Sequence, residues 1–420
     1  MNSPRVIARH LQPVIAQRLA EEPVVILTGA RTVGKSTLLA AYSQVHGTPV
    51  TDLDDIATRR AVAADPTLFT SGRAEPICLD EFQHVPVLLD AIKAELNRDL
   101  RPGRFLLTGS TRYGTLPRAS QSLTGRAHVM TLWPLSQGEL RGKKETFLDV
   151  LMSDPASLTT PEPSRTDRSG YERMVLAGGF PIALARPTPT ARDRWFRDFV
   201  DMVVERDVLE IRRVRQRRVL PLILRHLAAQ TACVLNVSSI AATVQLESRL
   251  VGDFVSLLES VFLVHRLEAF GRTLSSRVGR MPKVHLVDSG LAAYLLGISE
   301  PKLASRDPST LTEFGHVVET FAVNELIKQA GWSSAQVRFA HFRTRDGHEV
   351  DLVAESGEGK AAAIEVKASA TIADPDFRGL RLLRDRLGAD FLGGVLLNLG
   401  QRSYTYDDRL HVMPLDRLWA

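Results

Sequence analysis

The chain has 420 residues, of which 44% are apolar and 24% charged, and its formal net charge is +5. The length predicts two or three domains, each large enough to bury a core. The two cysteines, Cys78 and Cys233, lie far apart in the sequence and form no spaced set, so they suggest neither a disulfide scaffold nor a zinc site. This cysteine usage favours a reducing, cytoplasmic compartment.

No apolar run approaches the ~18 residues of a membrane span, and the first residues, MNSPRVIARH, lack a signal-peptide core. We therefore expect no membrane partner. The mild positive charge permits nucleic acid as a partner without requiring it. Residues 5 to 21 predict an amphipathic helix interrupted at Pro13.

The most informative stretch is GARTVGKS, which follows an apolar strand and leads into the helical sequence TLLAAYSQV. Two glycines five positions apart allow the backbone to wrap a phosphate, Lys35 reaches the β- and γ-phosphates, and the Ser36 hydroxyl binds Mg²⁺. The structural alternative is a glycine-rich turn with a surface lysine. The residues predicted to bind the nucleotide are Gly29, Ala30, Arg31, Thr32, Val33, Gly34, Lys35, Ser36 and Thr37, with Ser110 on a later strand.

Acidic residues follow two of the next predicted elements. Asp52, Asp54 and Asp55 precede a helix, where they serve as a metal site or, more simply, as helix caps. Asp80 and Glu81 end the apolar strand PICLDEF, at the edge where parallel sheets bind ligands. Asp80 is the predicted Mg²⁺ ligand, direct or through water, and Glu81 the residue that orients and deprotonates the attacking water.

Two further positions are candidates for the same site. The strand RFLLTGSTRY ends in hydroxyl residues, and if it lies beside the Asp80 strand, Thr108 or Ser110 can sense the γ-phosphate. An ordinary strand end is the alternative. Arg126 precedes the last predicted strand and could reach the phosphate of a neighbouring subunit as a trans arginine, or it could be a solvated strand-entry residue.

These blocks resemble a known family. GARTVGKS, LDEFQHVPVLLDAIK, FLLTGS and LTGRAHVMTLWPLSQGEL are similar to the AAA-type ATPases of bacteria and archaea that carry a C-terminal domain of unknown function. Later blocks extend the resemblance over nearly the whole chain: GGFP, VVERDVLEI, PKVHLVDSGLAAYLLG, TEFGHVVETFAVNEL, EVDLV and IEVKAS. The resemblance implies an AAA+ core, a helical and winged-helix middle, and a restriction-nuclease-like C-terminal fold.

The middle of the chain predicts a connector and two modules. Residues 153 to 169 carry three prolines among Ser and Thr, which is typical of a flexible connector. Trp195, Phe196 and Phe199 recur at helical spacing and predict a core face. The segment IRRVRQRR is the densest basic patch, which is either a solvated face or a contact with nucleic acid or a neighbouring subunit.

Residues 235 to 267 predict a winged helix. Its second helix carries Glu247, Asp253 and Glu259 against Arg249, and this negative balance favours a structural or protein-contact role over DNA reading. The loop GRTLSSRVGRMPK is more basic and is the expected contact if the module touches nucleic acid. Its basic residues are Arg272, Arg277, Arg280 and Lys283.

The C-terminal third predicts a second set of acids. Asp351 lies on one strand, and Glu365 and Lys367, two apart on the next, share a face. Two carboxylates for a metal, with a lysine nearby, form the arrangement of PD-(D/E)xK nucleases, and Glu319 on the preceding helix matches the additional acidic position of that fold. An acid two before a lysine occurs three times in the chain, but only this pair lies in an apolar strand.

The predicted fold class is α/β: a P-loop AAA+ parallel sheet, a helical and winged-helix region, and a restriction-endonuclease-like α/β domain. The predicted boundaries are 1–152, 153–169, 170–283 and 284–420. The leading functional hypothesis is an ATPase that uses ATP and Mg²⁺, forms a homo-oligomer such as a hexameric ring, and acts on DNA or other nucleic acid through a nuclease-like region. The alternative is an ATP-dependent protein-binding switch or scaffold with an inactive nuclease fold. A nucleotide kinase is disfavoured because no phosphate-acceptor pocket is legible.

Overall fold

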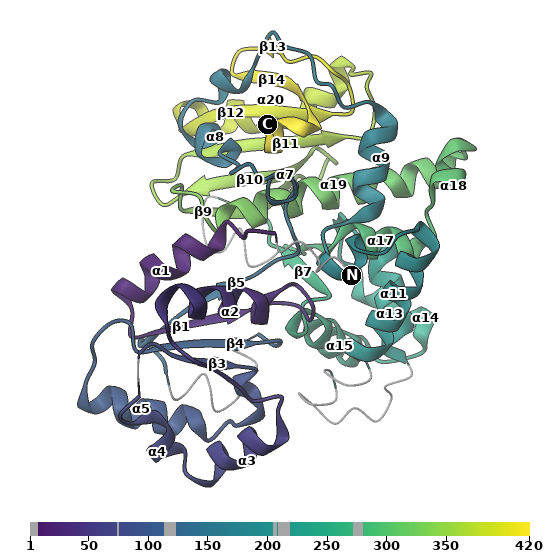
Figure 1. Ribbon diagram of the computed structural model, residues 1–420. Helices are drawn as coiled ribbons and strands as arrows, with labels where there is room; N and C mark the ends of the chain where they lie inside the picture. Colours follow the sequence, from purple (N-terminus) through teal and green to yellow (C-terminus); the bar gives the residue numbers. More distant parts are fainter. Residues whose placement is uncertain (1–6, 74, 113–122, 205–207, 209–218, 272–279) are drawn as a thin grey trace. The chain divides into compact units, whose positions relative to one another are not determined.

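The computed structural model describes residues 7–73, 75–112, 123–204, 208, 219–271 and 280–420 (Figure 1). The chain divides into two compact units, which are described separately. The first unit comprises Met1–Leu135, Met202–Arg215 and Ser260–Phe262, and the second comprises Ser136–Asp201, Gln216–Glu259 and Leu263–Ala420. In the ranges that the structure describes, no helix is long and apolar enough to cross a membrane.

The first unit is built on a five-stranded sheet in the order β2-β3-β4-β1-β5. All of its strand pairs are parallel, which confirms the predicted parallel sheet. Strand β4 lies between β1 and β3, so the carboxyl ends of these three strands meet at one edge. The strands are β1 (Val24–Thr28), β2 (Val50–Asp52), β3 (Ile77–Asp80), β4 (Phe105–Gly109) and β5 (Ala127–Thr131).

A proline and a capping residue explain where two helices of this unit begin. Helix α1 begins at Leu11 and runs through Pro13, because proline is tolerated in a first turn but not in a helix interior. Asp55 accepts a hydrogen bond from the Thr58 N–H at 2.7 Å and caps α3, so the capping interpretation is confirmed for Asp55 alone among the three acids. The helices are α1 (Leu11–Glu21), α2 (Lys35–His46), α3 (Ile56–Ala64), α4 (Pro66–Thr70), η1 (Phe82–His84) and α5 (Leu88–Arg98).

The second unit contains a helical region held together by a buried carboxylate. Asp288 accepts hydrogen bonds from the Gly179 N–H at 2.6 Å and the Leu291 N–H at 2.9 Å. A Cβ on Gly178 would lie 2.2 Å from Oδ1 of Asp288, which explains the first glycine of the GGFP block. The helices are α9 (Arg168–Ala177), α10 (Pro181–Leu184), α11 (Pro189–Met202), α13 (Leu220–Ala229), α17 (Ser289–Leu296) and α18 (Glu300–Ala304).

On α11, Phe196 and Phe199 are buried; Phe199 stacks on Trp195, and Phe196 packs edge-on against Trp195 and Phe180, so the predicted core face is confirmed. Two more helices, α14 (Val237–Val244) and α15 (Ser248–Ser260), accompany a three-stranded antiparallel sheet in the order β6-β8-β7. The strands are β6 (Cys233–Val234), β7 (Val264–Leu267) and β8 (Lys283–Leu286). The basic patch IRRVRQRR and the wing residues Arg272 and Arg277 lie outside the described residues.

The C-terminal part is a six-stranded mixed sheet in the order β13-β14-β12-β11-β10-β9. The chain runs through α19, three antiparallel strands, α20 and then β12, which pairs parallel to β11. The elements are α19 (Pro308–Ala330), β9 (Val337–Arg343), β10 (Glu349–Ser356), β11 (Ala361–Lys367), η6 (Asp374–Phe377), α20 (Arg378–Leu387), η7 (Gly388–Asp390), β12 (Phe391–Asn398), β13 (Tyr404–Asp407), β14 (Leu410–Pro414) and η8 (Leu415–Trp419).

The segment from residue 136 to 169 packs within the second unit. It contains α7 (Gln137–Arg141), α8 (Phe147–Ser153) and η3 (Pro155–Leu158). The Gln137 N–H donates to Oε2 of Glu325 on α19 at 2.8 Å, and the Thr166 hydroxyl donates to Asp416 at 2.8 Å. The stretch predicted as a flexible connector is therefore tied to the C-terminal sheet at its far end.

Candidate nucleotide site and carboxylate cluster

The loop between β1 and α2 has the backbone that its glycines predict. Gly34 has φ of 100°, a left-handed conformation that favours glycine, and it directly precedes α2. Gly29 is required for a different reason, because a Cβ there would lie 2.3 Å from the carbonyl oxygen of Leu132 after β5. The first N–H groups of α2 have no acceptor within the helix, so they are available to the oxygens of a phosphate at this loop.

Lys35 is buried beneath this loop. Its side chain is 4% exposed, and Nζ donates to the carbonyl oxygens of Gly29 at 3.0 Å and Ala30 at 2.9 Å. An ammonium group held against the loop it belongs to is placed for a phosphate bound in that loop. The glycine cradle, the lysine and the hydroxyl of Ser36 are together the donor set that a nucleotide phosphate requires, so the residues present fit this group.

Arg9 also holds the loop, and no motif in the sequence pointed to it. Its Nη1 donates to the carbonyl oxygen of Val33 at 2.7 Å and its Nη2 to that of Trp133 at 2.6 Å. The guanidinium therefore joins the phosphate loop to the chain that follows β5. A lone arginine 20 residues before Gly29 carries no spacing signal, so only the folded chain reveals this contact.

The carboxyl ends of β3 and β4 bring the predicted acids and hydroxyls together. The hydroxyl of Thr108 donates to Oδ1 of Asp80, and the pairing of β3 with β4 confirms that the two strands lie side by side. Gln83 Nε2 donates to Oε2 of Glu81 and to the Ser110 hydroxyl at 3.2 Å. Gln83 was not predicted as a site residue, although it stands two positions after Glu81.

Glu81 occupies a strained backbone position. Its φ of 53° and ψ of 49° are left-handed, which costs a non-glycine residue on the order of 1–3 kcal/mol. Such strain persists where the surrounding structure fixes the residue, and it is commonest at active sites. The conformation turns the Glu81 side chain toward Gln83 at the end of β3.

Arg126 lies at the amino ends of the strands of the same sheet, whereas the phosphate loop lies at their carboxyl ends. It precedes Ala127, which pairs with Val24 at the start of β1, whereas the phosphate loop follows Thr28. A strand of five residues spans about 16 Å at ~3.3 Å per residue. Arg126 therefore does not reach the loop of its own chain, and its Nη1 is buried without a hydrogen-bond partner.

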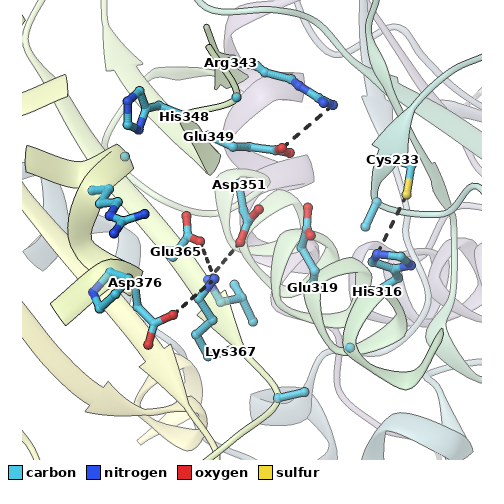
Figure 2. A pocket seen from close by; sticks show the side chains of 18 of the residues that line it. Cys233, His316, Glu319, Arg343, His348, Glu349, Asp351, Glu365, Lys367 and Asp376 are labelled. Atoms are coloured by element: carbon cyan, nitrogen blue, oxygen red, sulfur yellow. Dashed lines mark hydrogen bonds and ion pairs between the residues drawn. The ribbon is translucent and has the colours of Figure 1, made fainter. Parts of the chain in front are cut away.

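The second unit gathers the other predicted site residues in one pocket of about 640 Å³. Figure 2 shows Glu319, Asp351, Glu365 and Lys367 converging from α19, β10 and β11. Nζ of Lys367 contacts Oε1 of Glu365 at 2.8 Å, and Oδ2 of Asp351 accepts from the Val366 N–H at 2.9 Å. The predicted juxtaposition of Asp351 with the Glu365 strand is thus observed.

An additional lysine, not predicted, occupies the centre of these acids. Lys283 on β8 is 1% exposed, and its Nζ lies 2.7 Å from Glu319, 2.6 Å from Glu349 and 3.1 Å from Asp351. We call these four residues the Lys283 cluster. The sequence interpretation assigned Lys283 to a basic wing, although its place between apolar residues in PKVHLV was a signal of burial.

The charges in this cluster are strongly coupled. Burial lowers the pKa of Lys283, but Asp351, Glu319 and Glu349 outweigh it and raise that pKa well above its ordinary value, so the ammonium stays charged. Burial, followed by the charge of Asp351, raises the pKa of Glu365 to about 8. Oε2 of Glu365 is buried and has no hydrogen-bond partner.

The two sites differ in how they suit a metal ion. At the phosphate loop, Ser36 and Asp80 supply oxygen ligands of the kind that Mg²⁺ prefers. In the cluster, Nζ of Lys283 contacts one oxygen of Glu319 and one oxygen of Asp351. The described residues contain no group of three His, Cys, Asp or Glu side chains arranged to hold a metal. The predicted second metal site at Asp351 and Glu365 therefore does not fit a metal in this arrangement.

Three segments of the chain match models of known families. Residues 21–141 match an AAA domain, residues 168–302 match a domain of unknown function (DUF8612) and residues 314–418 match a domain of unknown function (DUF4143). The first match covers the phosphate loop and the five-stranded sheet, and it supports an AAA-type nucleotide-binding domain there. The descriptions of the other two families name no activity.

Uncharacterized proteins of Mycobacterium tuberculosis and Mycobacterium bovis are each 26% identical to this chain over 363 residues, which cover 85% of this chain and 73% of theirs. The crystal structure of a signal transduction ATPase with numerous domains and a tetratricopeptide repeat sensor, from Pyrococcus horikoshii, matches with a TM-score of 0.27 at 15% identity. The match covers 78% of this chain and 51% of that one, so the chain spans about half its length.

Proposed function

We propose that the first unit is a Mg²⁺-dependent ATPase of the AAA+ type. The observation that carries the proposal is that one edge of a parallel sheet presents the phosphate loop after β1, two carboxylates after β3 and a hydroxyl after β4. Hydrolysis of a nucleoside triphosphate needs a phosphate cradle, a metal-binding carboxylate and a base within one site, and the loop and the two carboxylates supply them. The AAA domain match over residues 21–141 supports the same assignment.

The residues have separate roles in this proposal. Residues 29 to 37 cradle the phosphates through backbone N–H groups, and Lys35 neutralises their charge. Bound Mg²⁺, held by Ser36 and Asp80, would withdraw charge from the transferred phosphate. Glu81 takes the proton of the attacking water, and the Gln83 amide fixes its carboxylate. Thr108 orients Asp80, and Ser110 holds Gln83 in turn.

Steady-state hydrolysis by the purified full chain tests this assignment. We expect turnover to be lost in Lys35→Ala and, because general-base catalysis contributes about 10²- to 10⁴-fold, to fall by that order in Glu81→Gln. Glu81→Gln should still bind ATP, since the phosphate cradle is intact. Normal ATP turnover in both variants would contradict the proposal.

The position of Arg126 supports assembly as a homo-oligomeric ring. An arginine at the edge opposite its own phosphate loop can serve as a trans arginine only for another subunit. We expect Arg126→Ala to abolish hydrolysis and leave ATP binding intact. A monomer that hydrolyses ATP at the full rate, established by sedimentation in the presence of nucleotide, contradicts the ring.

The C-terminal part of the second unit is proposed to have a nuclease-like fold that binds a partner without cutting it. The order helix, three antiparallel strands, helix and parallel strand, with acids on the two central strands, supports that fold. The position of Lys283 favours a non-cleaving role, because it engages two of the acids that a metal would need. ATP turnover would then switch the binding state of this part.

Cleavage is the second candidate, and the Glu365–Lys367 pair favours it. Lys367 lies on the pocket wall beside a buried carboxylate, which is the placement of a lysine that acts next to a reacting phosphate. Single- and double-stranded DNA and RNA are incubated with Mg²⁺ or Mn²⁺ and with wild type or Lys367→Ala. Cutting by wild type that Lys367→Ala abolishes supports cleavage, and equal or absent cutting refutes it.

Nucleic acid is the proposed partner, and a groove of about 790 Å³ supports it. The helices α14 and α15 with the β6-β8-β7 sheet are proposed as a winged helix. The groove beside α14 is lined by Arg280, Arg343 and Arg345, and no acidic residue lines it among those that the structure describes. Binding of a duplex that weakens steeply with salt, and weakens further in Arg345→Ala, is expected. No binding at low salt favours a protein partner.

A further inference from the structure

The Lys283 cluster satisfies the ammonium group in full. An ammonium has three N–H donors, and Nζ of Lys283 has three carboxylates within 3.1 Å, contributed by α19 and β10. Lys283 itself comes from β8, which belongs to a different sheet. The charge is therefore brought into the nuclease-like core from outside it.

The ammonium of Lys283 lies against acids that a metal ion would need in this fold. In the nuclease-like fold proposed above, a divalent ion would be held by Asp351 and Glu365, with Glu319 as the additional acid. Two of these three acids contact Nζ of Lys283 directly. A divalent cation placed among the same oxygens would be repelled by the ammonium at a separation where the protein interior screens charge poorly.

One oxygen in the pocket is left over. Glu365 is 7% exposed, its Oε1 contacts Lys367, and its Oε2 has no hydrogen-bond partner. The leftover oxygen belongs to a residue that lines the pocket, as do Glu319, Glu349 and Asp351. Six acidic residues line this pocket, and among the described ion pairs Lys283 contacts three of them while Lys367 contacts Glu365 and Asp376.

We propose that Lys283 is a built-in cation that replaces the divalent metal of this core, and that removing its charge turns the cluster into a site for one divalent cation. The inference rests on the nuclease-like fold proposed above. In the wild-type chain the cluster joins β8 to α19 and β10 as a fixed structural ion set. The acids that remain after Lys283 is neutralised are oxygen ligands of the type that Mn²⁺ and Mg²⁺ take.

The test is Mn²⁺ binding to the nucleotide-free full chain, followed by the loss of the electron paramagnetic resonance signal of free Mn²⁺. We compare wild type with Lys283→Met, which keeps the length of the side chain without the charge, and with Lys283→Arg, which keeps the charge. Lys283→Met should gain one site that binds Mn²⁺ at least about tenfold more tightly than wild type does, and Lys283→Arg should not. Adding Glu365→Gln to Lys283→Met should remove the new site.

Two results overturn the inference. One is a Mn²⁺ site in wild type that disappears in Asp351→Asn, which needs no change at Lys283. The other is a folded Lys283→Met protein that binds Mn²⁺ no better than wild type. If Lys283→Met does not fold, Lys283→Met combined with Glu349→Gln removes one charge of each sign and keeps the three core acids, and the same comparison applies. No nucleotide is present, so failure here leaves the ATPase proposal intact, and loss of the ATPase proposal leaves this test unchanged.

Discussion

The two units each contain a buried lysine, and the two lysines have different contacts. Lys35 donates to the carbonyl oxygens of Gly29 and Ala30 in its own loop. Lys283 is equally buried but lies among three carboxylates. The same residue type, at similar burial, therefore contacts the backbone carbonyls of its own phosphate loop in one unit and three carboxylates in the other.

The difference explains which site can still attract a charged ligand. An ammonium held by carbonyl dipoles keeps a net positive field that favours a phosphate. An ammonium surrounded by three carboxylates leaves a net negative field, and its own charge is consumed in stabilising the fold. The comparison assigns ligand chemistry to the first lysine and structure to the second.

The largest expected effect is on turnover at Lys35. Lys35→Met should lower kcat for ATP hydrolysis by about 10²- to 10³-fold or more, because one buried positive group aimed at the transferred phosphate is worth that much in comparable sites. The thermal unfolding midpoint of the first unit should change little. The matched control is Lys93→Met, since Lys93 is an exposed lysine on α5 of the same unit. A large loss of stability with normal turnover would reverse the comparison.

Lys283→Met should show the reverse pattern. Removing one partner of a buried ion set leaves the others uncompensated, which costs about 3–5 kcal/mol. Amide hydrogen exchange of β10 and β11 measures this locally, and ATP turnover per folded molecule should stay at the wild-type rate. Lys360→Met, at an exposed lysine just before β11, is the control. Unchanged protection of β10 in Lys283→Met contradicts a structural role.

The first site was predictable because its parts are contiguous motifs. The loop from Gly29 to Ser36 carries its own glycines, and Asp80 with Glu81 ends an apolar strand whose place in a parallel sheet follows from its composition. That β4 lies beside β3 was a condition of the prediction for Thr108, and the strand order met it. Arg9 and Gln83 were not predicted as site residues, because single polar residues outside a motif form no periodic pattern.

The second site was predictable only in part. Asp351, Glu365 and Lys367 follow from strand alternation, and Glu319 from the family resemblance. Lys283 could not be placed, because it lies 68 residues from Asp351 and reaches it through a strand of another sheet. The apolar residues around Lys283 in PKVHLV indicated that it is buried. Which acids surround a buried lysine, however, depends on tertiary packing. That unpredicted contact is what changes the interpretation from a metal site to an ion cluster.

A smaller effect is expected at Thr108. Thr108→Val keeps the shape of the side chain and removes the hydroxyl that donates to Asp80. Partners that orient a metal-binding carboxylate are typically worth 10- to 100-fold, so kcat should fall by about tenfold at saturating Mg²⁺. Thr111→Val is the control, because Thr111 is buried nearby and its hydroxyl has no hydrogen-bond partner. Equal effects of the two substitutions would show that packing, not orientation, is being measured.

A further effect concerns His341 on β9, whose pKa is lowered in part by the Lys283 charge. Burial first, and then the charge of Lys283, lowers the pKa of His341 from 6.5 to about 4, while Glu349 acts in the opposite direction. A histidine that stays neutral in the folded chain but takes up a proton when unfolded destabilises the fold as pH falls below 6.5, and this loss of stability is complete near pH 4.

The loss of stability amounts to about 2 kcal/mol. It should be smaller in His341→Gln, in which the amide can still donate to the Met281 carbonyl. Hydrogen exchange of β9 at pH 7 and pH 4.5 measures it, with His348→Gln as the control. An acid loss in His341→Gln as large as in wild type would assign the sensitivity to other buried groups, His285 among them, whose pKa is lowered well below its ordinary value mainly by burial.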